Sequence, residues 1–228
     1  MDICGEITEL LKSEGAVDVG FSKIGADPFG ENTYAVSVVA KLSDAVIEEI
    51  DGEPTHTYFH HYRTVNAFID RLCLRVGLLL ESRGYRYIPV AASQSINKDG
   101  WNYEGRFSHK MAAGLAGLGG VGKNGLFLHK KFGPRVRLGT VLTDCRFDIE
   151  PSEYRSPCIG CDACVGACPS GAIKGALWQE GMDRSEIFDP AACSNYMKKE
   201  FKHIGRGAVC GICIKVCPIG VNYGTEKN

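Results

Sequence analysis

Four cysteines between residues 158 and 168 constrain this chain more than any other feature. They follow the pattern C-x2-C-x2-C-x3-C, a proline comes directly after the last one, and they are Cys158, Cys161, Cys164 and Cys168. This spacing is typical of segments that hold [4Fe-4S] clusters through cysteine thiolates. Where two clusters are present, the first three cysteines bind one cluster and the fourth binds the other. The pattern therefore predicts a second set of ligands further along the chain.

A shorter copy of this pattern follows near the end of the sequence. Its three cysteines are Cys210, Cys213 and Cys217, and a proline comes directly after Cys217. Gly207 stands where the first cysteine of a complete run would be. Cys193 is the nearest spare cysteine, so we predict that it supplies the missing thiolate. By the pairing rule above, one cluster is bound by Cys158, Cys161, Cys164 and Cys217, and the other by Cys168, Cys193, Cys210 and Cys213.

Zinc and disulfide bonds are the two alternatives for a chain with 11 cysteines. C-x2-C pairs also bind zinc, but zinc sites usually consist of two separated pairs rather than a continuous run closed by Cys-Pro. Residues 1–6 carry acids where a secretory signal would carry positive charge, so we expect a reducing cytoplasm, in which disulfides are rare. The pattern therefore favours iron–sulfur clusters, and we assign Cys4, Cys73 and Cys145 to structure.

The charge balance argues against a protein whose net positive charge attracts nucleic acid. The 228 residues carry 26 basic and 27 acidic side chains, a formal net charge of −1. No apolar stretch is long enough to span a bilayer, so we expect a cytoplasmic protein without a membrane partner. A proline and a polar stretch begin at residue 151, and we predict one domain over residues 1–150 and a cysteine-rich domain over residues 151–228.

Hydrophobic periodicity predicts helices and strands in the first domain. Helices are expected at residues 3–13, 43–50 and 108–118, with a long one between Thr55 and Gly84. Strands are expected at residues 17–21, 34–42, 85–90, 126–128 and 135–143. Residues 91–106 form a long polar loop, and such loops are often functional.

Residues 119–124 form a glycine-rich loop. Together with the preceding residues, this loop matches the sequence patterns of two nucleotide-binding motifs but not their expected structural context. Gly117 to Gly122 fits G-x-G-x-x-G, and with Lys123 the stretch nearly fits a phosphate-binding P-loop. Both motifs require a strand before the loop and a helix after it, whereas the sequence predicts the opposite order. Asn124 also stands where a P-loop needs Ser or Thr. The glycine amides and Lys123 remain suited to facing a ligand, and a structural turn is the alternative.

Taken together, the glycine loop and the cysteine runs resemble epoxyqueuosine reductases. The likeness is strongest between residues 107 and 217, and it is carried by residues 116–119, 122–124, 132–133 and 138–144 together with the two cysteine runs. Reductive dehalogenases are similar but more distant. The resemblance implies an α+β fold. In such a fold, a nitroreductase-like α/β domain binds cobalamin without its lower base, and a ferredoxin-like domain carries two [4Fe-4S] clusters.

The sequence departs from that family in three places. Residues 91–94, Ala-Ala-Ser-Gln, stand where the family carries Val-Asp-Ser-Ala-Pro, whose aspartate is the expected proton donor. Gly120 replaces a tryptophan, and the sequence ends at Asn228 without the helical-repeat extension of many members. Basic residues that could contact phosphates locally are Lys130, Lys131, Arg135 and Arg137, and Lys198, Lys199, Lys202 and Arg206. We therefore expect a small molecule or a corrinoid protein as partner, rather than tRNA.

The sequence predicts a cobalamin-dependent iron–sulfur reductase that receives electrons from a low-potential donor. Candidate corrinoid contacts are Ser93, Gln94, Ser108, His109, Lys110, Gly122, Lys123 and Asn124. Candidate proton donors, in place of the absent aspartate, are Tyr103, Glu104 and His109. Two alternatives stay open: a ferredoxin-like electron-transfer protein that reduces a corrinoid partner, and a corrinoid carrier without catalysis.

Overall fold

The computed structural model describes residues 2–96, 100, 103–150, 152 and 154–221. The chain divides into two compact units, and each draws on three ranges of the sequence. Unit 1 takes Met1–Lys41, Val65–Leu118 and Arg137–Arg155, and unit 2 takes Leu42–Thr64, Gly119–Val136 and Ser156–Asn228. Unit 2 thus joins the cysteine-rich part to two earlier segments. The sequence predicts a single boundary, with domains at residues 1–150 and 151–228, whereas these two units alternate along the chain. The two-domain division stays a prediction.

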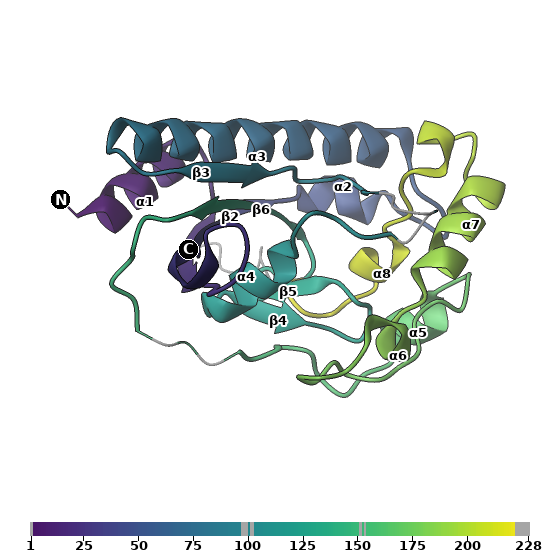
Figure 1. Cartoon of the computed structure of the whole chain (residues 1–228). Coiled ribbons are helices and arrows are strands. Elements are labelled where there is room, and N and C mark those ends of the chain that lie inside the picture. The colour runs from purple at the N-terminus through teal and green to yellow at the C-terminus, as the bar shows by residue number, and fades with distance from the viewer. Residues whose placement is uncertain (1, 97–99, 101–102, 151, 153, 222–228) are drawn as a thin grey trace, which may run out of the picture. The chain divides into compact units, whose positions relative to one another are not determined.

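Unit 1 is built on a four-stranded sheet in the order β1-β2-β6-β3 (Figure 1). The strands are β1 (Asp18–Lys23), β2 (Tyr34–Lys41), β3 (Tyr87–Val90) and β6 (Val136–Thr143). β1 pairs antiparallel with β2, and β3 pairs antiparallel with β6. The first seven residues of β2 are all buried, as expected of a strand that is covered on both faces.

Three helices belong wholly or largely to unit 1. α1 (Ile3–Ser13) begins at Asp2, whose side chain accepts from the Gly5 N–H at 2.8 Å. α3 (His56–Ser82) begins after Thr55, whose Oγ1 accepts from the Tyr58 N–H at 3.0 Å. α4 (His109–Leu115) lies against β1 and β2. Gly114 of this helix leaves room for the ring of Tyr154, because a Cβ at this position would collide with that ring.

Unit 2 contains a short hairpin and several short helices. The hairpin pairs β4 (Gly119–Val121) with β5 (Phe127–His129). The helices are α2 (Asp44–Glu48), α5 (Ala163–Ala167), α6 (Arg184–Ile187), α7 (Pro190–Glu200) and α8 (Ile212–Lys215). Arg135, only 2% exposed in its side chain, binds the carboxylates of Asp44 at 3.1 Å and Glu48 at 2.7 Å. The prediction that Arg135 contributes to a basic surface patch is therefore wrong.

The predicted helices and strands of residues 3–143 are confirmed, with one correction. Residues 119–121 were predicted as part of a loop, but they form strand β4. Glycine permits this strand, because a Cβ on Gly119, at φ +154°, would collide with the carbonyl of Leu128 on β5. The order α4, β4, β5 also confirms that the glycine-rich segment follows a helix and precedes a strand. It lacks the strand-loop-helix context of a P-loop or dinucleotide fingerprint.

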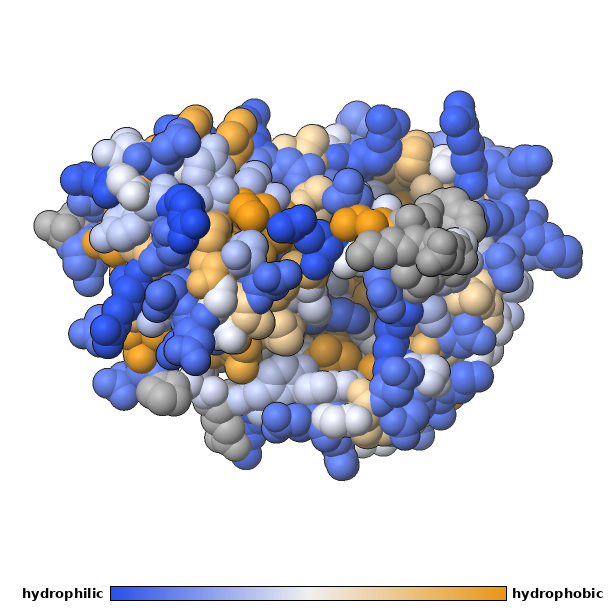
Figure 2. Space-filling model, in the orientation of Figure 1, coloured by the Kyte–Doolittle hydropathy of each residue, from blue (hydrophilic) through white to orange (hydrophobic). Residues whose placement is uncertain are grey.

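Surface hydrophobicity is scattered, and the face in Figure 2 shows hydrophobic residues interspersed among hydrophilic ones. Within the described residues, no helix combines the length and apolar character needed to cross a bilayer. Residues 97–99, 101 and 102 of the predicted polar loop lie outside the described part of the chain, as does Asn228. In the described part of that loop, the Ile96 N–H donates to the Glu104 carbonyl at 2.7 Å.

Candidate iron–sulfur centres

A pocket in unit 2 brings together the first predicted set of four cysteines. It is lined by Cys158, Cys161, Cys164 and Cys217, together with Lys123, Asn124, Leu128, Ile159, Pro218 and Ile219. Cys164 lies on α5, and Cys217 follows α8 by two residues. Because α5 packs against α8, the cysteine from the second run reaches the three from the first. We call these four cysteines group A.

The four cysteines of the second predicted set also belong to unit 2, and we call them group B. It consists of Cys168, Cys193, Cys210 and Cys213. Burial raises the pKa of Cys193 to about 12, and nearby charge on Cys210 and Cys168 adds to this shift. Burial, then charge on Cys210, Cys193, Cys168 and Cys164, likewise raises the pKa of Cys213. Cys193 lies on α7, and the assignment of these four thiols to one cluster stays a prediction.

Several thiols of both groups are in surroundings suited to binding metal. Burial raises the pKa of Cys217 to about 11 and also raises those of Cys164 and Cys210. Buried thiols of this kind keep their protons unless a cation compensates the thiolate charge, so metal binding would release protons. Four cysteine thiols per group match the donor set of a [4Fe-4S] cluster. The residues present therefore fit the predicted cofactor.

The pKa of Cys168 shifts in the opposite direction from those of Cys164, Cys210 and Cys217. Burial acts to raise its pKa, but hydrogen bonds from Ser170, Ala172 and Ile173 outweigh burial and lower it. The Ser170 hydroxyl lies 3.3 Å from the Cys168 sulfur. Hydrogen bonds to a cluster sulfur are among the features that tune its reduction potential.

A single metal ion is held by three or more side chains that meet at one point. Among the described residues, no set of three or more His, Cys, Asp or Glu side chains is placed to hold one ion. In a four-iron cluster each thiolate binds a different iron atom, so its four sulfur atoms stand further apart than the ligands of one ion. The assignment of the eight cysteines to two clusters stays a prediction that this geometry supports.

The three remaining cysteines lie in unit 1. Cys73 is fully buried on α3, and burial raises its pKa to about 12. Cys145 is buried, and Cys4 is partly buried with a pKa that burial raises to about 11. Their surroundings are consistent with the predicted structural role.

The glycine-rich segment contributes two side chains to the group A pocket. Lys123 Nζ donates to Asp162 Oδ1 at 2.6 Å. Asn124 is 3% exposed, and its Oδ1 accepts from the Leu126 N–H at 3.1 Å. The Gly122 N–H donates to the Leu126 carbonyl at 2.9 Å. These three predicted corrinoid contacts are thus engaged within unit 2, beside the cysteines.

The other predicted corrinoid contacts all lie in unit 1. Ser93 and Gln94 are exposed, and Lys110 is partly exposed at the start of α4. Ser108 caps that helix by accepting from the Met111 N–H at 3.3 Å. Glu104 is exposed, and Tyr103 has a φ of +56°, which non-glycine residues seldom adopt. Their role as corrinoid contacts stays a prediction.

His109 is held by both ring nitrogens. Its Nε2 donates to the Ala91 carbonyl at 3.0 Å, so its Nδ1 accepts from the Thr140 hydroxyl at 2.8 Å. Burial lowers the pKa of His109, and the charge of Arg137 lowers it further. A neutral ring with both nitrogens engaged favours a structural role, whereas its predicted role as proton donor stays untested.

A polar network around Ala92 was missed from the sequence. Asp70 Oδ1 accepts from the Ala92 N–H at 2.8 Å, and Arg137 donates to the Ala92 carbonyl at 3.3 Å. Arg137 Nε also donates to Asn66 Oδ1 at 2.8 Å. The available signal was the spacing of Asn66 and Asp70, two polar residues one helical turn apart on α3.

Comparison with known proteins supports the resemblance. Residues 157–220 match the family described as a 4Fe-4S double cluster binding domain. An epoxyqueuosine reductase of Pseudomonas aeruginosa is 31% identical over 119 residues, which cover 48% of this chain and 30% of that protein. A tetrachloroethene reductive dehalogenase of Desulfitobacterium hafniense is 32% identical over 117 residues, which cover 45% of this chain and 20% of that protein. The match thus spans less than a third of either relative.

Solved structures show that the fold is shared over nearly the whole chain. The catabolic reductive dehalogenase NpRdhA superimposes with a TM-score of 0.67 and 21% identity, over 93% of this chain and 31% of that one. The epoxyqueuosine reductase of Streptococcus thermophilus gives a TM-score of 0.57 and 20% identity, over 96% and 66%. This chain is therefore a mixed α/β protein that resembles epoxyqueuosine reductases, has a fold similar to that of reductive dehalogenases, and carries a 4Fe-4S double cluster domain.

Proposed function

We propose that this chain is a cytoplasmic iron–sulfur oxidoreductase that works with cobalamin to reduce a small molecule or a corrinoid protein. The observation that supports the proposal is the pocket in unit 2 lined by Cys158, Cys161, Cys164 and Cys217, together with the match of residues 157–220 to a 4Fe-4S double cluster binding domain. Its domain of residues 151–228 would bind both clusters, and a low-potential donor would supply the electrons. Bound clusters supply one-electron transfer, and a base-off corrinoid supplies a low-potential metal for the reduction.

The cysteines have defined tasks in this proposal. Cys158, Cys161, Cys164 and Cys217 hold one cluster, and Cys168, Cys193, Cys210 and Cys213 hold the other. Each thiol must lose its proton to bind iron, and the raised pKa values of most of them make this loss depend on the metal. Backbone and Ser170 hydrogen bonds to Cys168 would stabilise its thiolate.

The corrinoid site is assigned by likeness and by the candidates on the polar loop and the glycine-rich segment. One matching solved structure is described as a reductive dehalogenase with a B12-dependent mechanism. The candidate contacts are Ser93, Gln94, Ser108, His109, Lys110, Gly122, Lys123 and Asn124. The sequence contains no Asp-x-His-x-x-Gly motif, so the cobalt should bind without a histidine ligand. Tyr103, Glu104 and His109 are the candidates to deliver a proton to the substrate.

Metal analysis tests the first half of the proposal. Anaerobically purified and reconstituted protein should contain about eight iron and eight sulfide ions per chain, as two four-iron clusters require. Bound zinc, or only four irons after full reconstitution, would contradict the assignment.

Cobalamin binding tests the second half. Reconstituted protein should bind cobalamin at micromolar concentration and show a base-off absorbance spectrum. The electron paramagnetic resonance spectrum of cob(II)alamin should lack nitrogen superhyperfine splitting. Clusters without any cobalamin binding would instead identify a ferredoxin-like electron carrier, or an activator of a separate corrinoid protein. Binding without turnover would identify a corrinoid carrier.

A further inference from the structure

We propose that Lys123 and Asp162 set the reduction potential of the group A cluster, with Lys123 raising it and Asp162 lowering it. The inference rests on the proposed function only in requiring that group A binds a [4Fe-4S] cluster. It assigns Lys123, placed by sequence among the corrinoid contacts, a task at the iron–sulfur centre.

The positions of the two charges carry the inference. Lys123 lines the same pocket as the four group A cysteines, and its side chain is only 16% exposed. Asp162 lies between Cys161 and Cys164 in the sequence, and its side chain is 63% exposed. Lys123 is thus a largely buried residue of the pocket lining, while much of the Asp162 side chain is open to solvent.

The hairpin fixes the lysine where it is. The Gly122 N–H donates to the Leu126 carbonyl at 2.9 Å, and the Gly125 N–H donates to the Gly122 carbonyl at 2.9 Å. Asn124, the next residue after the lysine, donates to the Cys213 carbonyl at 3.5 Å. The backbone around Lys123 is therefore tied to Leu126, which precedes β5, and to Cys213 of group B. The bond to Asp162 Oδ1 then holds the ammonium group itself.

The direction of the effect follows from charge. One-electron reduction adds a negative charge to a cluster, so a nearby cation stabilises the reduced form and raises the potential. A nearby carboxylate does the opposite. Asp162 is more exposed than Lys123, so solvent and salt screen its effect more strongly. We therefore expect opposite signs, with the lysine the stronger of the two.

A purely structural ion pair makes a different prediction. If the Lys123–Asp162 bond only held the cysteine loop in place, removing either partner would loosen the same loop. Both substitutions would then shift the potential in the same direction, or would leave it unchanged. The sign of the two shifts separates the electrostatic role from the structural one.

The test is a potentiometric titration of the full, reconstituted chain, followed by electron paramagnetic resonance. Lys123→Met should shift the reduction equilibrium of one cluster about tenfold toward the oxidised form, which is about 59 mV more negative for one electron. Asp162→Asn should shift the same cluster in the positive direction by less. Lys123→Arg should keep the original value. As a control, Lys199→Met removes an exposed lysine paired with Glu200 and should shift neither cluster.

The outcomes are distinguishable. Shifts of the same sign in Lys123→Met and Asp162→Asn, or no shift with both clusters intact, overturn the inference. If Lys123→Met loses iron, the Asp162→Asn shift decides, and a negative or absent shift overturns the inference. A wild-type chain that binds no cluster at all would overturn the proposed function instead.

Discussion

Cys193 is a predicted cluster ligand although no cysteine motif surrounds it. It lies on α7, and charge on Cys210 and Cys168, both predicted ligands of the same cluster, adds to the burial that raises its pKa. The sequence pointed to it only through a shortage, because Gly207 leaves the second cysteine run one thiolate short. The structure brings it into group B, which makes the assignment directly testable.

Replacing Cys193 should therefore damage one cluster and spare the other. We expect Cys193→Ala to lose roughly half of the iron, because a four-iron cluster requires its fourth thiolate. Iron analysis and electron paramagnetic resonance of the reduced protein would measure this. The matched control is Cys73→Ala, a buried cysteine of unit 1, which should keep both clusters. Two intact clusters in Cys193→Ala would refute the assignment.

His109 supports a second prediction about a single side chain. Because burial lowers its pKa, its ring should titrate below the usual value of about 6.5. The unfolded chain then binds more protons than the folded one just below pH 6.5. The stability contributed by a neutral His109 is complete above that pH and falls as the pH drops toward the folded pKa. Histidine ring NMR, assigned with His109→Gln, would show the titration. A midpoint at or above 6.5 would contradict the structural role and favour proton donation.

The 3-10 helix at Gly205–Gly207 explains why the second cysteine run is incomplete. Gly207 has a φ of +73°, and a Cβ there would lie 2.6 Å from the Lys198 Cα. A cysteine at this position would be strained and would collide with α7, so the leading cysteine of the run cannot stand here. The thiolate comes from α7 itself instead. Spacing alone could not reveal this, because the reason is a contact between two helices.

Arg135 links the hairpin segment to α2, and Glu48 of α2 also binds Lys215 of α8. Arg135→Met should destabilise the protein by about 1–3 kcal/mol, below the cost of breaking a fully buried ion pair, because Asp44 and Glu48 are partly exposed. Thermal unfolding under argon should show a Tm lower by several degrees. Arg83→Met, which breaks an exposed pair with Glu6, should change Tm little. Equal effects of the two substitutions would contradict this account.

Most helices and strands of residues 3–143 were predictable from the sequence, whereas β4 and the long-range polar contacts were not. α1 and α3 follow from hydrophobic periodicity, and the two cysteine groups follow from spacing rules. β4 has three residues, two of them glycine, and forms only because β5 pairs with it. The Lys123–Asp162 pair joins residues 39 positions apart, and the Asp70–Ala92 bond joins residues 22 apart. Contacts of this kind form only when the chain has folded, so no local sequence pattern predicts them.

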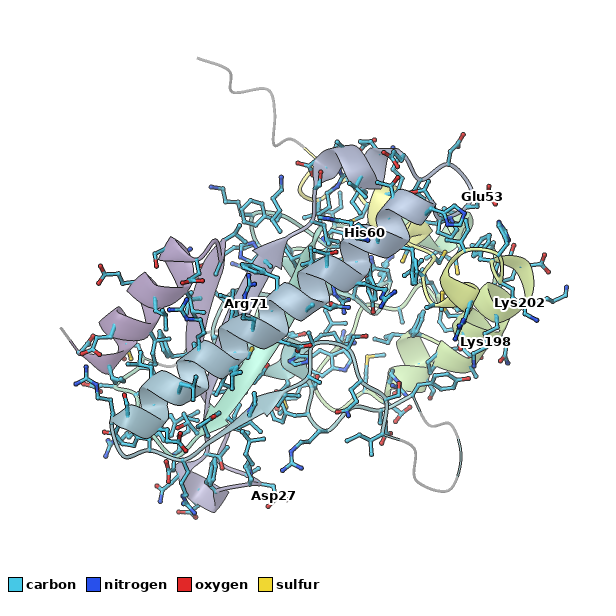
Figure 3. The ribbon with its side chains drawn as sticks, turned by 90° about the horizontal axis from the view of Figure 1, so that it is seen from above. Asp27, Glu53, His60, Arg71, Lys198 and Lys202 are labelled. Atoms are coloured by element: carbon cyan, nitrogen blue, oxygen red, sulfur yellow. The ribbon has the colours of Figure 1, made fainter. Side chains whose placement is uncertain are left out.

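For the whole molecule, the charge distribution bears on whether tRNA is a substrate. Net charge is −1, and Arg135 and Arg137 of the first basic group are engaged in internal contacts. In the second group, Lys198 and Lys202 lie near the end of α7 (Figure 3), and Lys199 binds Glu200 at 2.7 Å. Binding a tRNA stem requires several clustered basic contacts with phosphates. Among the described residues, the one such cluster consists of Lys198, Lys199, Lys202 and Arg206, and Glu200 interrupts it.

We therefore predict that this protein does not reduce epoxyqueuosine in tRNA efficiently. Removing oxygen from an epoxide requires a proton for the departing oxygen, and a positioned general acid contributes about 10²–10⁴-fold to such a step. Ala91 and Ala92 stand where the resembling family carries its aspartate, and the Ala92 N–H and carbonyl are bound to Asp70 and Arg137. The assay combines reconstituted protein, cobalamin, a low-potential reductant and epoxyqueuosine-containing tRNA. An epoxyqueuosine reductase such as that of Staphylococcus aureus serves as positive control. Queuosine formed over many turnovers would contradict the prediction. In that case Asp70→Asn would show whether that neighbouring carboxylate supplies the proton.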